Sequence, residues 1–302
     1  MTGSVAVVGP GSIGAYLAAQ LAAVGRDPVA CARRGFREYV IESSGGTLRA
    51  PARVVTDPDE LRATDAPAEW VLLAVKAHQT AAAAGWLARL CDATTTVVVL
   101  QNGVEGEEAV APLVGAASVL PSVLYIGARL DSPGRVKHGE ASRVIVPRRP
   151  ASAGLRRLFD GTPVEIEISD AYQRDAWRKL GVNVVSNGIT ALTRHPLAVM
   201  RRPDVAEVGR QLLEECWRVG RAEGADLGEA DVAATIALLQ GASPGLGSSM
   251  YYDRMAGRPT EHDALYGAVV RAGLRHGIHT PLAALMQALL AAGDPSPEQT
   301  SG

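Results

Sequence analysis

Cysteine is scarce in this chain of 302 residues, with only Cys31, Cys91 and Cys216. They lie far apart and form no Cys-x-x-Cys pair, and an odd number of them argues against a disulfide framework or a zinc site. The six histidines show no metal-ligand spacing, so the sequence predicts no metal. Scattered free thiols are typical of the reducing cytoplasm, where we expect this protein.

Net charge and aromatic residues are also low. Lys and Arg number 30 against 32 Asp and Glu, and aromatic residues make up 4%. A nucleic-acid-binding protein needs a basic face and often aromatic platforms for bases, so we expect no nucleic-acid partner. The first 25 residues carry no charge, but no Lys or Arg precedes this run, and Gly9 and Gly11 interrupt it short of the ~20 residues that span a bilayer. We predict neither a signal peptide nor a membrane partner.

Apolar, β-branched runs alternate with helical segments in the first half of the chain. The runs expected to form buried strands are 5–8, 28–32, 70–75, 96–100 and 119–125, and helices are expected after the first run, at 79–90 and from about 105. This alternation predicts an α/β fold, a doubly wound parallel sheet of the Rossmann type. Residues 131–168 contain a Ser132-Pro133-Gly134 turn and are expected to form an antiparallel extension.

Helix-period segments replace strands from about residue 170. They cover 171–193, 204–223, 229–240, 261–276 and 281–292. We therefore expect a Rossmann domain at 1–169, an all-α domain at 170–293 that carries substrate-binding and catalytic residues, and a flexible tail at 294–302. The alanine-rich helical domain could mediate a homodimer, although no spacing in it requires one.

A glycine motif follows the first predicted strand and opens the first helix. Gly9-x-Gly11-x-x-Gly14 matches the dinucleotide fingerprint, whose glycines allow a tight turn, close approach of a pyrophosphate and close helix–strand packing. Pro10 removes one N–H donor from the loop. The predicted cofactor-binding loop is Gly9, Pro10, Gly11, Ser12, Ile13 and Gly14. A glycine-rich turn without a ligand is the alternative.

Arg33 and Arg34 stand after the second predicted strand, where NAD-binding folds place an acidic residue. Two guanidinium groups could bind a 2′-phosphate, so the sequence favours NADP(H) over NAD(H), with a solvated arginine pair as the alternative. Lys76 and Asn102 end two further strands and are expected to face the cofactor crevice. The alternative for Asn102 is a simple turn with Gly103.

Three polar residues share one stripe of an apolar helix in the second half. Lys179, Asn183 and Asn187 are spaced at i, i+4 and i+8, which places an ammonium and two carboxamides on one face. The alternative is a solvated face, but such faces are usually built from Glu, Lys and Arg.

A Ser248-Ser249-Met250 segment follows, and then Thr260 and Asp263 in the spacing of a capping box. The sequence thus predicts a helix that starts at Thr260 and holds Glu261 in its first turn. A carboxylate there interacts favourably with the helix dipole, which is a sufficient structural reason for that residue.

Together these motifs resemble the ketopantoate reductase family (2-dehydropantoate 2-reductase). The resemblance runs in order from residue 5 to about 290. It rests on Gly9-x-Gly11-x-x-Gly14, Arg33-Arg34-Gly35, Val75-Lys76, Gln101-Asn102-Gly103-Val104, Lys179-Leu180-x-x-Asn183-x-x-x-Asn187, Ser248-Ser249-Met250 and Arg258-Pro259-Thr260-Glu261-x-Asp263-Ala264-Leu265.

The resemblance implies reduction of 2-dehydropantoate, a 2-oxo acid, to (R)-pantoate in pantothenate biosynthesis, with hydride from NADPH. It implies that Lys179 is the general acid and that Glu261 is its carboxylate partner, also near the cofactor ribose. Residues carried over as cofactor contacts are Lys76, Asn102 and Ala128, and those carried over as substrate contacts are Asn183, Asn187, Ser248 and Ser249.

Three positions depart from the family pattern towards an apolar pocket. Leu197, Leu246 and Tyr266 stand at or near places where relatives often carry polar residues. This leaves open an alternative within the family, the NADPH-dependent reduction of another 2-oxo acid or an imine in secondary metabolism. A protein that binds NADP(H) without turnover and acts as a regulator is the alternative from another class.

Overall fold

The computed structural model describes residues 3–295, apart from the side chain of Glu140. It divides into two compact units, Met1–Tyr172 and Gln173–Gly302, which are described separately. Within the described range, no helix is long and apolar enough to cross a membrane. Most of the expected tail, residues 296–302, lies outside the described residues.

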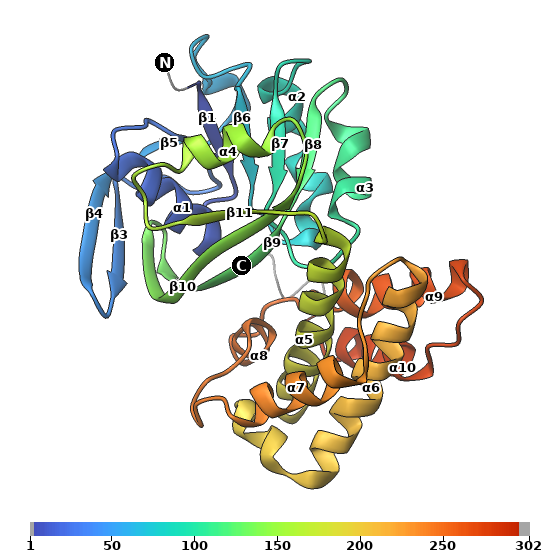
Figure 1. Cartoon of the computed structure of the whole chain (residues 1–302). Helices are drawn as coiled ribbons and strands as arrows, with labels where there is room; N and C mark the ends of the chain where they lie inside the picture. The colour runs from blue at the N-terminus through green and yellow to red at the C-terminus, as the bar shows by residue number, and fades with distance from the viewer. Residues whose placement is uncertain (1–2, 296–302) are drawn as a thin grey trace. The chain divides into compact units, whose positions relative to one another are not determined.

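Six parallel strands form the central sheet of the first unit (Figure 1). In spatial order they are β5 (Arg53–Val55), β2 (Val29–Cys31), β1 (Val5–Val8), β6 (Trp70–Leu73), β7 (Thr96–Val99) and β8 (Ser118–Pro121). Every residue of β1 and β6 is buried, as expected of strands covered on both faces. The predicted doubly wound parallel sheet is confirmed.

The two faces of this sheet are covered by different elements. In β1, Val5 and Val7 pack in the core with α1 (Ser12–Ala23), whereas Ala6 and Val8 pack in the core with α2 (Ala84–Leu90). The remaining helical segments of the unit are η1 (Pro58–Glu60), η2 (Ala77–Gln79), η3 (Ala81–Ala83), α3 (Gly106–Val110), η4 (Ala111–Leu113) and α4 (Ser152–Leu158). The single helix predicted at 79–90 is therefore wrong, because two short 3₁₀ turns precede α2. Thr80 lies between those turns and its Oγ1 donates to the Ala77 carbonyl at 2.8 Å.

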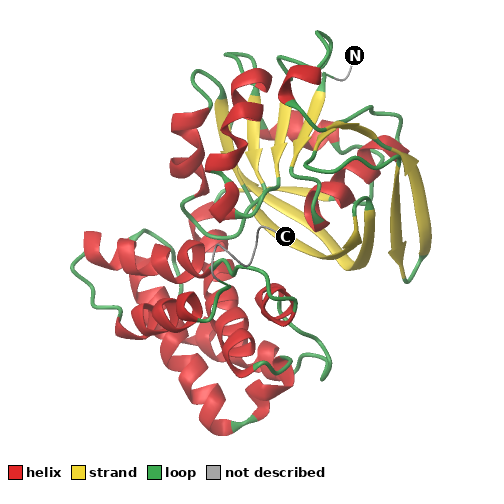
Figure 2. Ribbon diagram, turned by 180° about the vertical axis from the view of Figure 1, so that it is seen from behind, coloured by secondary structure: helices red, strands yellow, loops and turns green. Residues whose placement is uncertain are grey.

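A second sheet covers the outer side of α1 (Figure 2). It contains β3 (Glu38–Ser43), β4 (Gly46–Pro51), β9 (Val123–Ser132), β10 (Arg135–Pro147) and β11 (Glu165–Ser169). β10 is antiparallel to β9 but parallel to β3 and β11, so the extension is mixed and not purely antiparallel as expected. The β3–β4 hairpin was not predicted.

The strand predicted at 119–125 is in fact two strands in two sheets. Its first part is β8 and its second part begins β9, with Ser122 between them. Ser122 is buried, and its hydroxyl donates to the Val99 carbonyl at 2.7 Å. This tertiary hydrogen bond supports the break, which local β-propensity could not reveal.

The second unit is helical. Its elements are α5 (Tyr172–Thr193), η5 (Leu197–Arg201), α6 (Pro203–Ala222), α7 (Glu229–Gln240), α8 (Ser249–Met255), the π-helical turn η6 (Asp263–Gly267), α9 (Ala268–Arg275) and α10 (Pro281–Ala292). The predicted all-α character is confirmed, although α8 was not expected. Trp217 of α6 donates its indole N–H to the Trp177 carbonyl of α5 at 3.0 Å, and both rings are buried. This contact fixes α5, which carries the predicted lysine stripe.

Candidate functional site

The loop after β1 turns tightly enough to require glycine at two of its positions. Gly9 has φ +86°, and a Cβ there would lie 2.8 Å from the Val75 nitrogen. A Cβ on Gly14 would lie 2.5 Å from the Gly9 carbonyl oxygen. At Gly11, by contrast, a Cβ would meet no atom within 4 Å. The loop is thus closely packed against the protein at Gly9 and Gly14 but open at Gly11, where a ligand can approach its backbone.

Backbone N–H groups at the start of α1 form the anion-binding part of this loop. Gly11 is the N-cap, and no side chain caps the helix, so the amides of Ser12 and Ile13 stay available for an anion. The Gly11 amide donates to the Gly9 carbonyl at 2.7 Å, a three-residue turn centred on Pro10. Because that turn needs no donor at its centre, the missing N–H of Pro10 costs it nothing.

The loops after β6 and β7 lie beside the glycine loop. Ala74 donates to the Val8 carbonyl at 2.9 Å, so Lys76 follows directly along the same sheet edge as the end of β1. The buried Gln101 donates to the Val75 carbonyl at 3.1 Å and to the Thr80 hydroxyl at 2.8 Å. Gln101 thereby ties the Asn102 loop to the Lys76 loop, a role that the sequence analysis missed because its signal is tertiary.

The remaining predicted cofactor residues lie in different places. Arg33 and Arg34 follow β2 at the same carboxyl edge, and both side chains are exposed. Within the described residues neither forms an ion pair or a side-chain hydrogen bond, which leaves both guanidinium groups available to an anion. Ala128 lies on β9 of the second sheet, where it pairs with His138. It is therefore not at the carboxyl edge of the central sheet, where the other predicted cofactor residues lie.

The predicted polar stripe in the second unit is largely buried. All three residues lie on α5, with Asn183 8% and Asn187 3% exposed and Lys179 half-buried. The alternative of a solvated face is therefore wrong for the two asparagines. The stripe continues one turn further to Thr190, which is fully buried. That residue was missed, although its i+3 spacing from Asn187 was visible in the sequence.

The Ser248-Ser249 segment packs against this stripe. The Ser248 hydroxyl lies 2.7 Å from the Thr190 hydroxyl and accepts from the Tyr251 amide at 3.0 Å, which caps α8. The Ser249 hydroxyl is 3.5 Å from the Asn187 carboxamide oxygen, to which it donates. The structure thus brings the two serines and the end of the stripe together.

Glu261 lies just before a helical segment, and its side chain is 6% exposed. The capping box predicted at Thr260 is wrong. Both the amide and the hydroxyl of Thr260 donate to the Asp294 carboxylate, at 3.0 and 3.1 Å. Asp294 was expected to begin the flexible tail but is half-buried in these contacts. Downstream, the Tyr266 hydroxyl donates to the Val184 carbonyl of α5 at 2.5 Å, which holds this segment beside the stripe.

Burial changes the acidity of the lysine on the stripe. It lowers the pKa of Lys179 from 10.5 to about 8, because the ammonium is less well solvated there than in water. At neutral pH the group is still mostly protonated, yet it gives up its proton more readily than an exposed lysine does. Such a group is suited to proton donation.

The three positions that depart from the family pattern have two different environments. Leu197 is buried, and its amide donates to the carbonyl of the exposed Leu246 at 2.9 Å. Tyr266 is fully buried, and its hydroxyl is used in the core contact with α5. Tyr266 is therefore a packing residue, whereas Leu197 and Leu246 are joined through their backbones.

Comparison with known proteins accords with this geometry. The family described as ketopantoate reductase PanE/ApbA matches residues 5–150, and its C-terminal counterpart matches residues 171–294. A 2-dehydropantoate 2-reductase of Caulobacter vibrioides is 39% identical over 95% of this chain and 98% of its own length. One from Mycobacterium tuberculosis is 37% identical over 98% of this chain and all of its own.

A solved structure shows the same arrangement of elements. A dimeric ketopantoate reductase from Staphylococcus aureus aligns with a TM-score of 0.84 and 26% identity, and covers 99% of this chain and 100% of its own. The chain therefore belongs to the ketopantoate reductase family and is an oxidoreductase that uses a nicotinamide cofactor.

Proposed function

We propose that this protein reduces 2-dehydropantoate to (R)-pantoate with NADPH. The observation that carries the proposal is the buried stripe on α5, in which a lysine with a lowered pKa stands beside two buried carboxamides. A 2-oxo acid needs a proton donor at its ketone and hydrogen bonds to its other oxygens, and this stripe offers both. The two relatives with that activity in their names support the substrate.

The first unit fits a dinucleotide cofactor. The open side at Gly11 and the uncapped start of α1 suit a pyrophosphate. The exposed guanidinium groups of Arg33 and Arg34 suit a 2′-phosphate, which supports NADPH over NADH. Lys76, Asn102 and Ala128 are the further cofactor contacts that we propose in this unit.

The catalytic work of the chain is proton transfer. NADPH, when bound, supplies the hydride for the ketone carbon. Lys179 donates a proton to the ketone oxygen and stabilises the negative charge that develops there. Glu261, which is buried on the segment that Tyr266 holds to α5, orients the lysine in this proposal.

Three uncharged side chains hold the substrate in this proposal. They are the carboxamides of Asn183 and Asn187 and the hydroxyl of Ser249. Ser248 belongs to the same site, but its hydroxyl is shared with Thr190 and the α8 cap. We therefore assign Ser248 the role of positioning Ser249. Uncharged groups of this kind select a substrate by satisfying its hydroxyl and carboxylate oxygens.

Another 2-oxo acid or an imine is the second candidate substrate class, because of the leucines at two positions of the second unit. The Leu197 amide donates to the Leu246 carbonyl, which brings two leucines together at or near positions where family members often carry polar residues. A bulkier or less polar 2-oxo acid, or an imine, would suit such a neighbourhood. Tyr266 no longer supports this alternative, because its side chain is used in packing.

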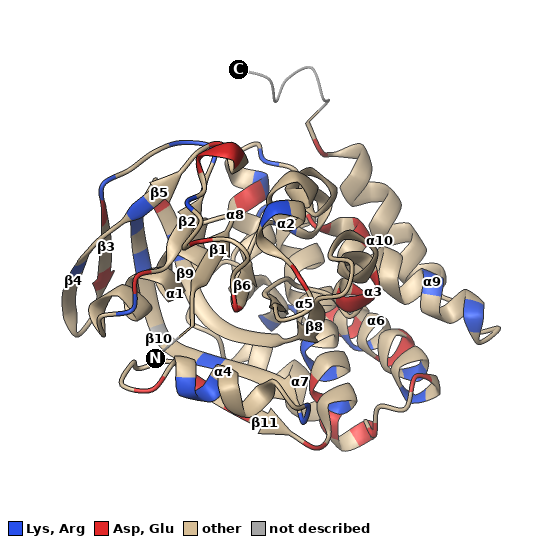
Figure 3. Cartoon of the chain, turned by 90° about the horizontal axis from the view of Figure 1, so that it is seen from above, with Lys and Arg blue, Asp and Glu red and all other residues tan. Residues whose placement is uncertain are grey.

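The domain assignment and the assembly are part of the same proposal. We assign cofactor binding to residues 1–169 and substrate binding to 170–293, in a cytoplasmic protein whose three cysteines are free thiols. We assign dimerisation to α10, which carries no charged residue (Figure 3). Its Leu285 and Leu289 are 54% and 48% exposed, as expected of a face that a second copy covers. The Staphylococcus aureus relative, which is described as dimeric, supports a dimer.

The test is the loss of reduced-nicotinamide absorbance with purified protein and 2-dehydropantoate, run with NADPH and with NADH. Rapid turnover that depends on NADPH is the expected result. If a panel of bulkier 2-oxo acids is reduced faster, the second substrate class is correct. Binding of NADPH without turnover of any of them would support the regulatory alternative and contradict an enzymatic role.

A further inference from the structure

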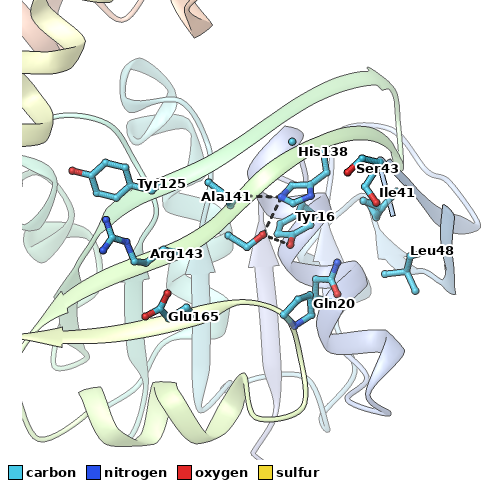
Figure 4. Close-up of a pocket in the computed structure, with 14 residues that line it drawn as sticks. Tyr16, Gln20, Ile41, Ser43, Leu48, Tyr125, His138, Ala141, Arg143 and Glu165 are labelled. Carbon is cyan, nitrogen blue, oxygen red and sulfur yellow. Dashed lines mark hydrogen bonds between the residues drawn. The ribbon is translucent and has the colours of Figure 1, made fainter. Parts of the chain in front are cut away.

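A pocket of about 790 Å³ lies in the first unit, and its lining residues are not those that we propose to bind the cofactor. α1 forms one wall, and the second sheet forms the others (Figure 4). None of the glycine-loop residues, nor Lys76, Asn102 or Ala128, lines it. Its volume falls within the usual range for small-molecule sites. The sheet edge that carries the cofactor residues and this pocket are therefore separate sites.

A glutamine side chain from α1 faces the pocket. Gln20 is 8% exposed as a residue, and no described residue hydrogen-bonds to its side chain. Its carboxamide nitrogen and oxygen are not buried unsatisfied atoms, so they reach the open space of the pocket. Gln20 thus presents an unused donor and an unused acceptor to whatever occupies the pocket.

A fixed hydrogen-bond network lies one turn before Gln20. The Tyr16 hydroxyl is 2.5 Å from the Ser142 hydroxyl, which is 3.0 Å from His138 Nε2. The His138 ring stacks on the Tyr16 ring with centroids 4.1 Å apart. Figure 4 shows the Tyr16 and His138 rings together above Gln20. These contacts hold the polar groups in place before any ligand arrives, which lowers the entropic cost of binding.

The charges of the described side chains that line the pocket balance at neutral pH. Burial lowers the pKa of His138, which keeps the imidazole neutral. One cation and one anion remain in the lining, Arg143 and Glu165. The Arg143 guanidinium is already engaged, because it pairs with Glu167 at 3.0 Å and lies 4.8 Å from the centre of the Tyr125 ring. An anionic ligand would therefore lose its hydration without gaining a free counter-charge.

Apolar side chains line the other end of the pocket. Ile41 of β3 and Leu48 of β4 both face it, beside the hydroxyl of Ser43. We propose that this pocket binds a small uncharged molecule that pairs an amide group with Gln20 and places an apolar ring or chain against Ile41 and Leu48. An amide presents one donor and one acceptor side by side, which complements the Gln20 carboxamide with two hydrogen bonds. This site is independent of the proposed reductase activity.

The test uses benzamide and 2-pyridone as probes, with the full chain saturated with NADPH so that neither probe occupies the nicotinamide site. Calorimetric titration should show saturable binding of at least one probe. Benzoate matches benzamide in shape but is charged, and it should bind more weakly. Absence of binding by both probes, or tighter binding of benzoate, would overturn the proposal.

A substitution at Gln20 tests the contact itself. Gln20→Leu should weaken the binding of the amide probe at least ten-fold, because both hydrogen bonds to the carboxamide are lost. Gln211→Leu on the exposed face of α6 is the matched control and should leave probe binding unchanged. An unchanged NADPH affinity in Gln20→Leu would show that the unit is folded. Unchanged probe affinity would contradict the assignment.

Discussion

Asp294 accepts two hydrogen bonds from Thr260, one from its backbone amide at 3.0 Å and one from its hydroxyl at 3.1 Å. Thr260 directly precedes Glu261, the carboxylate that we propose as the partner of the catalytic lysine. The end of the described chain therefore holds the residue next to a proposed catalytic group. Sequence position alone had assigned Asp294 to a flexible tail.

We expect Asp294→Ala to lower kcat by about ten-fold, because a small misplacement of a catalytic group has a large effect on rate. Asp294→Asn keeps an oxygen acceptor and should recover most of the loss. Steady-state kinetics that separate kcat from KM check this, with Asp204→Ala on the exposed start of α6 as the control. A purely structural role would lower Tm and leave kcat unchanged.

Lys179→Ala should lower kcat by on the order of 10²–10⁴-fold, the usual share of general acid catalysis. Substrate and NADPH should still bind, since the rest of both sites is intact. Lys137→Ala removes an exposed lysine of β10 and is the matched control. Wild-type turnover in Lys179→Ala would show that another group donates the proton.

The pH dependence follows from the pKa of Lys179, which burial lowers to about 8. The donor must be protonated for reduction, so kcat/KM for the ketone should fall by about ten-fold per pH unit above this value. The reverse oxidation needs the neutral amine as a base and should rise through the same pKa. A reduction profile that stays flat up to pH 10 would contradict the assignment of Lys179.

Cofactor choice is tested at the arginine pair. The double substitution Arg33→Ala and Arg34→Ala should raise KM for NADPH by at least about ten-fold and leave KM for NADH nearly unchanged, because only the 2′-phosphate contacts are lost. Arg89→Ala, an exposed arginine of α2, is the control. Equal effects on both cofactors would mean that the pair does not recognise the 2′-phosphate.

The assembly is tested on α10. Light scattering of the wild-type protein should give the mass of a dimer, and Leu285→Arg combined with Leu289→Arg should give the mass of a monomer, because two charges cannot be buried unpaired in an apolar contact. Leu238→Arg places a charge at an exposed leucine of α7 and should leave the dimer intact. A monomeric wild type would contradict the proposed interface.

Much of the fold was predictable from local pattern. The runs at Val5–Val8 and Trp70–Leu73 are uninterrupted and apolar, which is typical of strands buried on both faces. The glycine motif is also local, because the turn and the close packing of Gly9 and Gly14 leave no space for a side chain. The spacing of Lys179, Asn183 and Asn187 placed them on one helical face, as the structure shows on α5.

The features that were missed depend on contacts between distant segments. The break at Ser122 coincides with its hydrogen bond to Val99, and local β-propensity is the same on either side of it. Asp294 has its role only because Thr260, 34 residues earlier, lies beside it. Gln101 likewise acts through loops that meet only in the folded sheet.

Periodicity and residue type were therefore enough to identify β1, β2, β6 and β7, the glycine turn and the lysine stripe, because each depends on neighbours within a few residues along the chain. The desolvation that lowers the pKa of Lys179, the packing role of Tyr266 and the unpartnered Gln20 in its pocket were decided by the tertiary structure. Burial and hydrogen-bond partners come from segments far apart in sequence, and no local pattern specifies which of them will meet.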